Sequence, residues 1–82
     1  MTGIGEPPKV SELQEASTRY QQVVEKNPND ARLLTNLAWS YERARDFGRA
    51  IEEFRRALQV DPTYTDARYG LALALLGNRQ IE

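Results

Sequence analysis

The chain has 82 residues, enough for one small domain and too few for a multidomain enzyme. Eleven basic residues against twelve acidic ones leave a formal net charge of −1, so the overall balance favours neither nucleic acid nor an anionic membrane as a partner. The absence of Cys and His excludes disulfides, a structural zinc site and catalytic groups that depend on a thiol or an imidazole. We therefore expect no catalytic residues, no cofactor and no metal site.

No stretch of the sequence approaches the roughly 20 apolar residues with which a helix crosses a bilayer. The first nine residues lack the basic-then-apolar order of a secretion signal. These two observations predict a cytoplasmic protein without a membrane partner.

Apolar residues recur at helical spacing along most of the chain. In chain order, the pattern predicts a flexible segment at 1–10, helices near 11–26, 30–44, 47–60 and 64–77, and a C-terminal tail at 78–82 that could be the start of a further helix. Candidate capping residues precede each helix: Ser11 with Gln14 as a capping box, Asn29 or Asp30, Asp46, and Thr63. The sequence is therefore that of an all-α domain.

The chain is similar to itself at an offset of 34 residues. Pro28 and Pro62 are related by this offset, and so are pairs at apolar helix positions: Leu13 and Phe47, Ala16 and Ala50, Tyr20 and Phe54, Val23 and Ala57, Val24 and Leu58, Leu37 and Leu71, Ala38 and Ala72, and Tyr41 and Leu75. A repeat of this length, with two apolar helices in each period, predicts helical hairpins that stack side by side.

The central period resembles the tetratricopeptide repeat family through eight residues: Leu34, Leu37, Ala38, Tyr41, Ala50, Phe54, Ala57 and Pro62. The resemblance implies one full repeat at about 31–64, flanked by two half repeats, within a domain at 11–77. The implied fold is a short α-solenoid of about four helices, built from antiparallel hairpins. Residues 1–9 contain two Gly and two Pro, so we do not expect them to supply a further helix.

The last predicted helix is apolar almost all round. By the repeat offset we expect one stripe to pack on the preceding helix, and the remaining apolar residues Tyr69, Leu73, Ala74 and Leu76 to face outward. The stripe comprises Tyr64, Ala67, Leu71, Ala72 and Leu75. Such a helix needs cover, which a missing helix, a second copy or a ligand could provide.

Trp39 lies opposite the stripe of its own helix, so it must be exposed, covered by another element or bound to a partner. In the family that the chain resembles, the first helices of successive repeats line a concave groove that binds peptides. The resemblance therefore implies a groove whose candidate partner-binding residues are Trp39, Tyr69, Leu73, Leu76, Arg32, Asn36 and Arg43, with Thr35 and Asp66 nearby.

The leading functional prediction is a scaffold that binds a peptide or helical segment of another protein, without catalysis. The alternative is a structural segment that self-associates, as a homo-oligomer through its C-terminal helix or within a larger repeat protein. RNA binding would need a stronger basic stripe than Arg32 and Arg43 provide. Clamping of a partner's C-terminal carboxylate, known in one subgroup of the family, has only Asn36 in its favour, because Asp66 and Gly70 occupy the places of the required cations.

Overall fold

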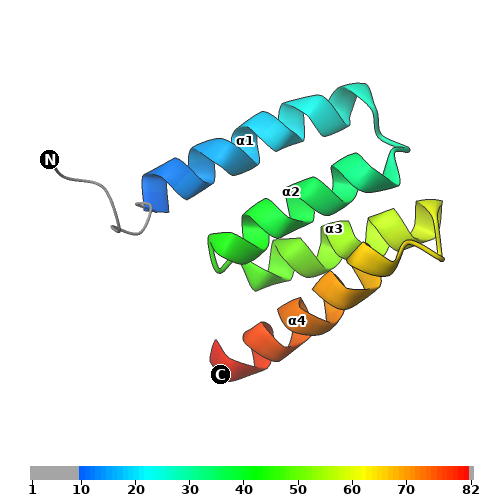
Figure 1. Cartoon of the computed structure of the whole chain (residues 1–82). Coiled ribbons are helices and arrows are strands. Elements are labelled where there is room, and N and C mark those ends of the chain that lie inside the picture. The colour runs from blue at the N-terminus through cyan, green and yellow to red at the C-terminus, as the bar shows by residue number, and fades with distance from the viewer. Residues whose placement is uncertain (1–9, 82) are drawn as a thin grey trace, which may run out of the picture.

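The computed structural model describes residues 10–81, except for the side chains at 10, 11, 13, 80 and 81. Four helices follow one another in this range: α1 (Val10–Lys26), α2 (Ala31–Arg43), α3 (Phe47–Val60) and α4 (Thr65–Ile81). Each runs antiparallel to the one before it, and the four form a row in chain order (Figure 1). This arrangement confirms the predicted all-α fold of stacked helical hairpins.

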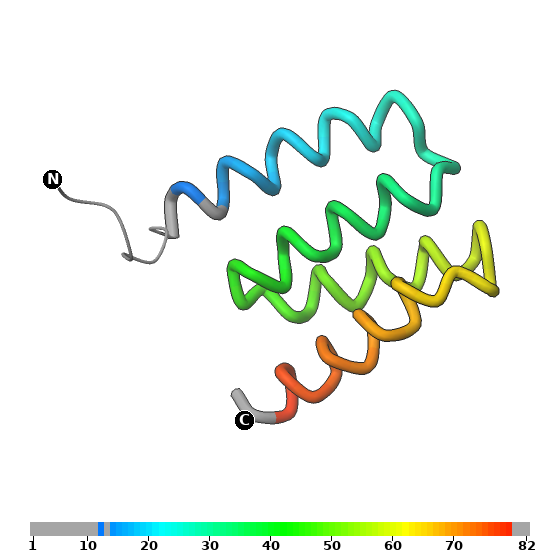
Figure 2. Tube along the Cα trace, in the orientation of Figure 1, coloured from blue at the N-terminus to red at the C-terminus, as the bar shows by residue number. Residues whose placement is uncertain are grey.

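The helices at the two ends of the row lie far apart in the Cα trace (Figure 2). Within the described residues α1 packs only against α2, whereas α4 packs mainly on α3 and also reaches across to α2. The two central helices therefore carry most of the packing, and α1 and α4 each leave one side uncovered.

The predicted helix boundaries differ from the observed ones mainly at the C-terminus. Helix α4 continues to Ile81, so residues 78–81, which we expected to form a tail, are helical. Gly77 does not end the helix because it serves packing instead: a Cβ atom there would come within 2.6 Å of the Phe47 ring. At the other end, Val10 already begins α1, and the rest of the predicted flexible segment lies outside the described residues.

Two of the predicted caps are present. The Asp30 side chain accepts hydrogen bonds from the first turn of α2, and Asp46 accepts one from the Arg49 backbone N–H at the start of α3. The prediction for Thr63 is wrong, because its hydroxyl donates to Asp61 at 2.7 Å instead of capping α4. Between α2 and α3 the chain reverses through Arg45, whose φ of 62° lies in the left-handed region.

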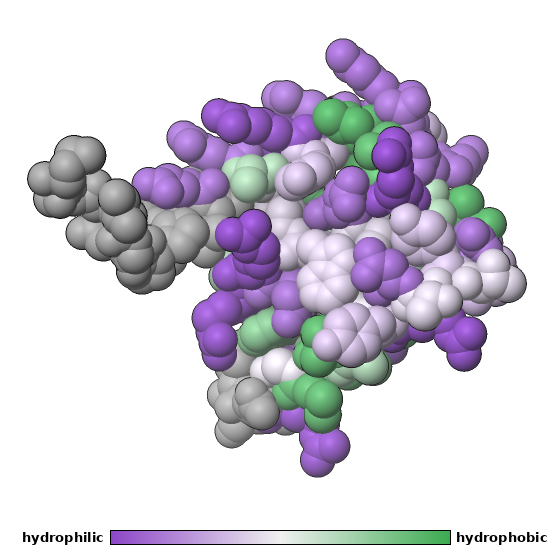
Figure 3. Space-filling model, viewed as in Figure 1, coloured by the Kyte–Doolittle hydropathy of each residue, from purple (hydrophilic) through white to green (hydrophobic). Residues whose placement is uncertain are grey.

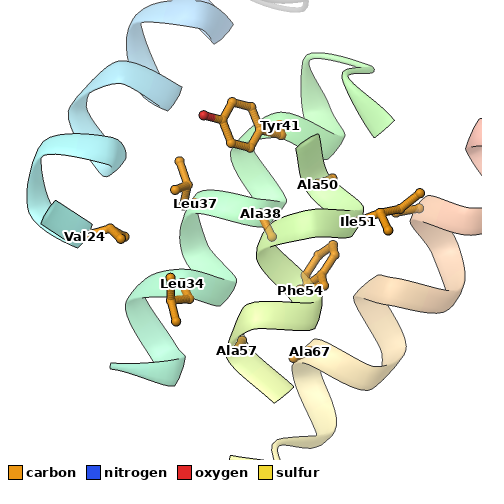
Figure 4. Close-up of a cluster of buried hydrophobic side chains, with 11 residues drawn as sticks. Val24, Leu34, Leu37, Ala38, Tyr41, Ala50, Ile51, Phe54, Ala57 and Ala67 are labelled. Carbon is orange, nitrogen blue, oxygen red and sulfur yellow. The ribbon is translucent and has the colours of Figure 1, made fainter. Parts of the chain in front are cut away.

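The hydrophobic core lies between α2 and α3, and α1 and α4 contribute from either side (Figure 4). Phe54 and Leu34 are completely buried. The α2 and α3 residues that carry the family resemblance, Leu34, Leu37, Ala38, Tyr41, Ala50, Phe54 and Ala57, are confirmed as the centre of this core, which also contains Val24, Ile51, Ala67 and Ala74.

The predicted packing stripe of α4 is wrong in part. Ala67, Gly70 and Ala74 are buried, whereas Ala72 and Leu75 are exposed. The offset of 34 residues relates Ala72 and Leu75 to α2 positions that face the following helix, α3. Helix α4 instead packs on the helix before it, so a different side of it is buried.

Candidate partner-binding groove

The N-cap of α2 fixes where this helix begins and therefore which side chains face the candidate groove. Asp30 Oδ1 accepts hydrogen bonds from the backbone N–H groups of Arg32 at 3.0 Å and Leu33 at 3.2 Å. These bonds satisfy two of the amide groups that a helix start leaves unpaired. Three turns of α2 then carry Asn36, Trp39 and Arg43 along one side.

Trp39 is half-buried and links three helices. Its ring meets Phe54 of α3 edge to face, with centroids 5.1 Å apart and an interplanar angle of 81°, and lies 6.3 Å from the ring of Tyr69 on α4. The sequence left three possibilities for Trp39: exposure, cover by another element, or binding to a partner. The structure shows that α4 partly covers it.

An acidic side chain lies beside the indole. Trp39 Nε1 donates a long hydrogen bond of 3.4 Å to Asp66 Oδ2 at the start of α4. Because this carboxylate sits where a clamp for a partner's carboxylate would need a cation, the geometry does not favour such a clamp.

A hollow of about 180 Å³ opens beside Trp39, between α1 and α2. It brings together three predicted residues, Asn36, Trp39 and Arg43, and it adds Ala16, Tyr20 and Ser40, which we did not predict as site residues. Sequence reasoning assigned Ala16 and Tyr20 to packing alone. The sequence did contain a sign that Tyr20 is not fully buried: it carries a hydroxyl group, whereas the equivalent residue of the next repeat is the buried Phe54.

The predicted residues on α4 differ in exposure. Tyr69 is 62% exposed and Leu76 is 55% exposed, whereas Leu73 is half-buried. Thr35, expected near the same wall, is fully buried, and its hydroxyl donates to the Ala31 carbonyl at 2.7 Å. It is therefore unavailable to a partner.

The described structure brings some candidates together and leaves others apart. Trp39 and Tyr69 lie side by side, and Trp39 shares the hollow with Asn36 and Arg43. The other four candidates do not line it: Arg32, Tyr69, Leu73 and Leu76. Residues of intermediate to high hydropathy gather over the middle of this face and over α4, between hydrophilic groups (Figure 3). Such a mixture of aromatic, aliphatic and basic groups is typical of protein interfaces.

A second hollow, of about 260 Å³, is more polar. It lies between α1 and the α2–α3 turn, and its lining includes Gln21, Tyr41 and Arg49. Gln21 Nε2 donates to the Tyr41 hydroxyl at 2.6 Å, and burial, reinforced by the negative charge of Glu53, raises the pKa of Tyr41. The hydroxyl therefore remains protonated at neutral pH and acts as a hydrogen-bonding group.

Within the described residues, no cluster of three or more Asp and Glu side chains is placed to hold a metal ion. In the same part of the chain, no helix is long and apolar enough to cross a membrane. The fold and the candidate groove together define a helical repeat protein, in which one complete hairpin, α2 with α3, has a helix on either side.

The chain belongs to the tetratricopeptide repeat family, because the pattern of this family matches residues 9–65 and again residues 35–82. Repeats of this family are typically non-catalytic and generally mediate protein–protein interactions. Membership confirms the resemblance that the central repeat suggested.

Two curated proteins show similarity to the chain. Anaphase-promoting complex subunit 3 of Schizosaccharomyces pombe is 31% identical over 68 residues, which cover 83% of this chain and 10% of that protein. The peroxisomal targeting signal receptor of Candida glabrata is 34% identical over 55 residues, 67% of this chain and 9% of that protein. The chain thus spans about a tenth of the length of these relatives. No solved structure is similar enough to count as a match.

Proposed function

We propose that this chain is a protein-interaction module that holds a peptide or helical segment of a partner on the surface formed by α2 and α4. The observation that carries the proposal is the pair of neighbouring aromatic rings on this surface. Trp39 is fixed against the core by Phe54, and Tyr69 beside it remains 62% exposed. Rigid, partly exposed aromatic side chains are the groups that most often dominate binding energy at protein interfaces.

Polar groups near the two rings would orient the bound segment. Arg43 is exposed at the hollow next to Trp39, and Asn36 is half-buried there. An extended segment has free backbone carbonyl groups, for which the Arg43 guanidinium and the Asn36 amide are suitable donors. The names of the two relatives, one a subunit of a complex and the other a receptor for a targeting signal, are consistent with a binding role.

The test is a peptide-library screen read by the fluorescence of Trp39, which is the only Trp in the chain. For a selected peptide, Tyr69→Ala and Arg43→Ala should each weaken binding by about 5-fold to 30-fold, which corresponds to about 1–2 kcal/mol. Arg55→Ala is the matched control, because Arg55 is an exposed arginine on α3 that does not line the hollow.

Retained helical circular dichroism would show that the variants fold. The proposal fails if the library yields no ligand, or if Tyr69→Ala and Arg43→Ala bind a selected peptide as tightly as the original chain does.

A further inference from the structure

Within residues 10–81, helices α1 and α4 each have an uncovered side, and the internal repeat of the chain shows which kind of helix fits each side. The offset of 34 residues relates α1 to α3 and α2 to α4. In the middle of the row, α2 and α3 meet along a contact that we call the central seam. On the α2 side it contains Ala38, Trp39 and one edge of Tyr41, whose ring lies 6.0 Å from the Arg49 guanidinium of α3, and on the α3 side it contains Ala50 and Phe54.

The α3 side of the central seam has an exposed equivalent on α1. Ala50 and Phe54 are completely buried, whereas their counterparts Ala16 and Tyr20 are half-buried and 39% exposed, respectively. Phe54 is covered on one side by Trp39, and no described helix lies in the corresponding place beside Tyr20. Helix α1 thus presents the α3 half of a seam without its partner.

The α2 side of the central seam has an exposed equivalent on α4. Leu37, Ala38 and Tyr41 are at most 5% exposed. Of their counterparts on α4, Ala72 is exposed and Leu75 is 40% exposed, whereas Leu71 is half-buried and packs against the core of its own chain. Helix α4 thus presents the α2 half of a seam without its partner.

We propose that a second copy of this chain docks head to tail, with α4 of one copy against α1 of the next, and so rebuilds the central seam between molecules. In this contact Ala72 faces Ala16 of the second copy as Ala38 faces Ala50, and the small side chains allow close approach of the helices. Leu73 covers Tyr20 as Trp39 covers Phe54. The proposal needs no other protein, but Ala16 and Tyr20 also line the hollow beside Trp39, so a docked second copy and a bound peptide would compete for that hollow.

A second copy is favoured because the two uncovered faces are the counterparts of the two sides of the central seam, whereas a symmetric α4–α4 contact has no counterpart within the chain. The charges also differ in sign: α1 carries three acidic and two basic residues, whereas α4 carries one acidic and two basic residues. Opposite net charges favour the mixed pair over either like pair.

The contact should be weaker than the central seam and hence dependent on concentration. Arg68 stands where α2 has the fully buried Leu34, so one end of the rebuilt seam loses an apolar contact and must accommodate a charge. In addition, no covalent turn joins the two helices. Because every added copy again presents an uncovered α1 and an uncovered α4, the contact is heterologous and does not close at a dimer.

The experiment is sedimentation of the full chain over a wide concentration range, with Tyr20→Glu and Leu75→Glu as face-blocking variants. The original chain should form species larger than a dimer as concentration rises. Each variant alone should stay monomeric, because every junction needs both faces. An equimolar mixture should form only a species of twice the chain mass, because each variant retains the face that the other has lost. Val60→Glu, at an apolar α3 position 40% exposed outside the seam, should assemble like the original chain.

Cross-linking provides a second test that does not depend on a charge in the seam. The chain has no Cys, so Ala16→Cys and Ala72→Cys each introduce a single thiol. Under mild oxidation, a mixture of the two should cross-link mainly as the mixed 16–72 pair. A monomer at every concentration would overturn the proposal, as would a dimer that survives Tyr20→Glu or cross-links mainly as 72–72. Loss of peptide binding in the groove variants would leave these readouts unchanged, so the two proposals can fail separately.

Discussion

The ring of Phe54 on α3 lies directly against the backbone of Gly70 on α4. A Cβ atom at position 70 would overlap the ring carbons Cε1 and Cζ. Gly77, two turns further along α4, has the same relation to the ring of Phe47. Because the two glycines have no side chains, the phenylalanine rings of α3 pack directly against the backbone of α4.

Gly70→Ala should destabilise the chain although alanine is the better helix former. The intrinsic gain of about 1 kcal/mol from replacing a helical glycine is opposed by overpacking against Phe54, which typically costs about 1–3 kcal/mol. Urea unfolding followed by circular dichroism should show a lower midpoint. Gly48→Ala is the control, because nothing lies within 4 Å of its added Cβ atom, and it should raise the midpoint. Equal gains at both positions would contradict the close packing at Gly70.

Asp30→Ala should lower the free energy of unfolding by about 0.5–2 kcal/mol, since it removes the acceptor for two amide groups at the start of α2. Urea unfolding measures the change. Asn29→Ala, at the adjacent exposed position, is the comparison and should have a smaller effect. If the two variants were equally stable, the Asp30 cap would not contribute.

Glu42 should make stability depend on pH in the direction opposite to a salt-bridged carboxylate. Burial raises the pKa of Glu42, an effect that the nearby Arg45 only partly offsets, and Oε1 is buried without a hydrogen-bond partner. Because the folded chain holds this proton more tightly than the unfolded chain, the stabilising contribution is present below the ordinary glutamate pKa of about 4.3 and is lost as the pH rises through the folded pKa.

Unfolding free energies measured from acidic to neutral pH check this prediction. The difference between Glu42→Gln and the original chain should increase in favour of the variant as the pH rises. Curves that run parallel across this range would show that the carboxyl group does not titrate differently on folding.

Tyr69→Ala should shift the fluorescence emission of Trp39 to longer wavelength in the folded chain without unfolding it. Tyr69 lies 6.3 Å from the indole ring and is itself mostly exposed, so its loss admits water to the indole at little cost in packing. Emission spectra of the folded variant and of Arg55→Ala as control measure the effect. An unchanged spectrum would mean that Tyr69 does not shield Trp39.

The central hairpin could be predicted from the sequence because the apolar residues of α2 and those of α3 recur at helical spacing and bury each other. Leu34, Leu37, Ala50 and Phe54 all lie in the core as expected. Helix α4 could not be predicted as well, because the side that packs on α3 is made of Ala67, Gly70 and Ala74. Small residues carry almost no hydrophobic signal, so the predicted stripe included Ala67 and Leu71 correctly but extended to the exposed Ala72 and Leu75 and left out Gly70 and Ala74.

The candidate site was predictable only where its residues share one helix. Asn36, Trp39 and Arg43 follow from the helical spacing of α2, and the hollow contains all three. Its far wall, Ala16 and Tyr20, depends on how α1 crosses α2, which the sequence pattern does not specify. The partial cover of Trp39 by Tyr69 depends in the same way on the angle of α4.

The buried contact between Ser17 of α1 and Ser40 of α2 sets these two helices apart from the rest of the row. The two hydroxyl oxygens are 3.2 Å apart, and the Ser40 hydroxyl donates to the Leu37 carbonyl at 2.6 Å. One repeat further on, the equivalent pair is Ile51 and Ala74, both buried. A hydroxyl pair contributes about 1 kcal/mol, whereas a buried isoleucine contributes about 1.5–3 kcal/mol. Amide hydrogen exchange should therefore be fastest in α1, which would detach as a separate opening event while α2, α3 and α4 stay folded.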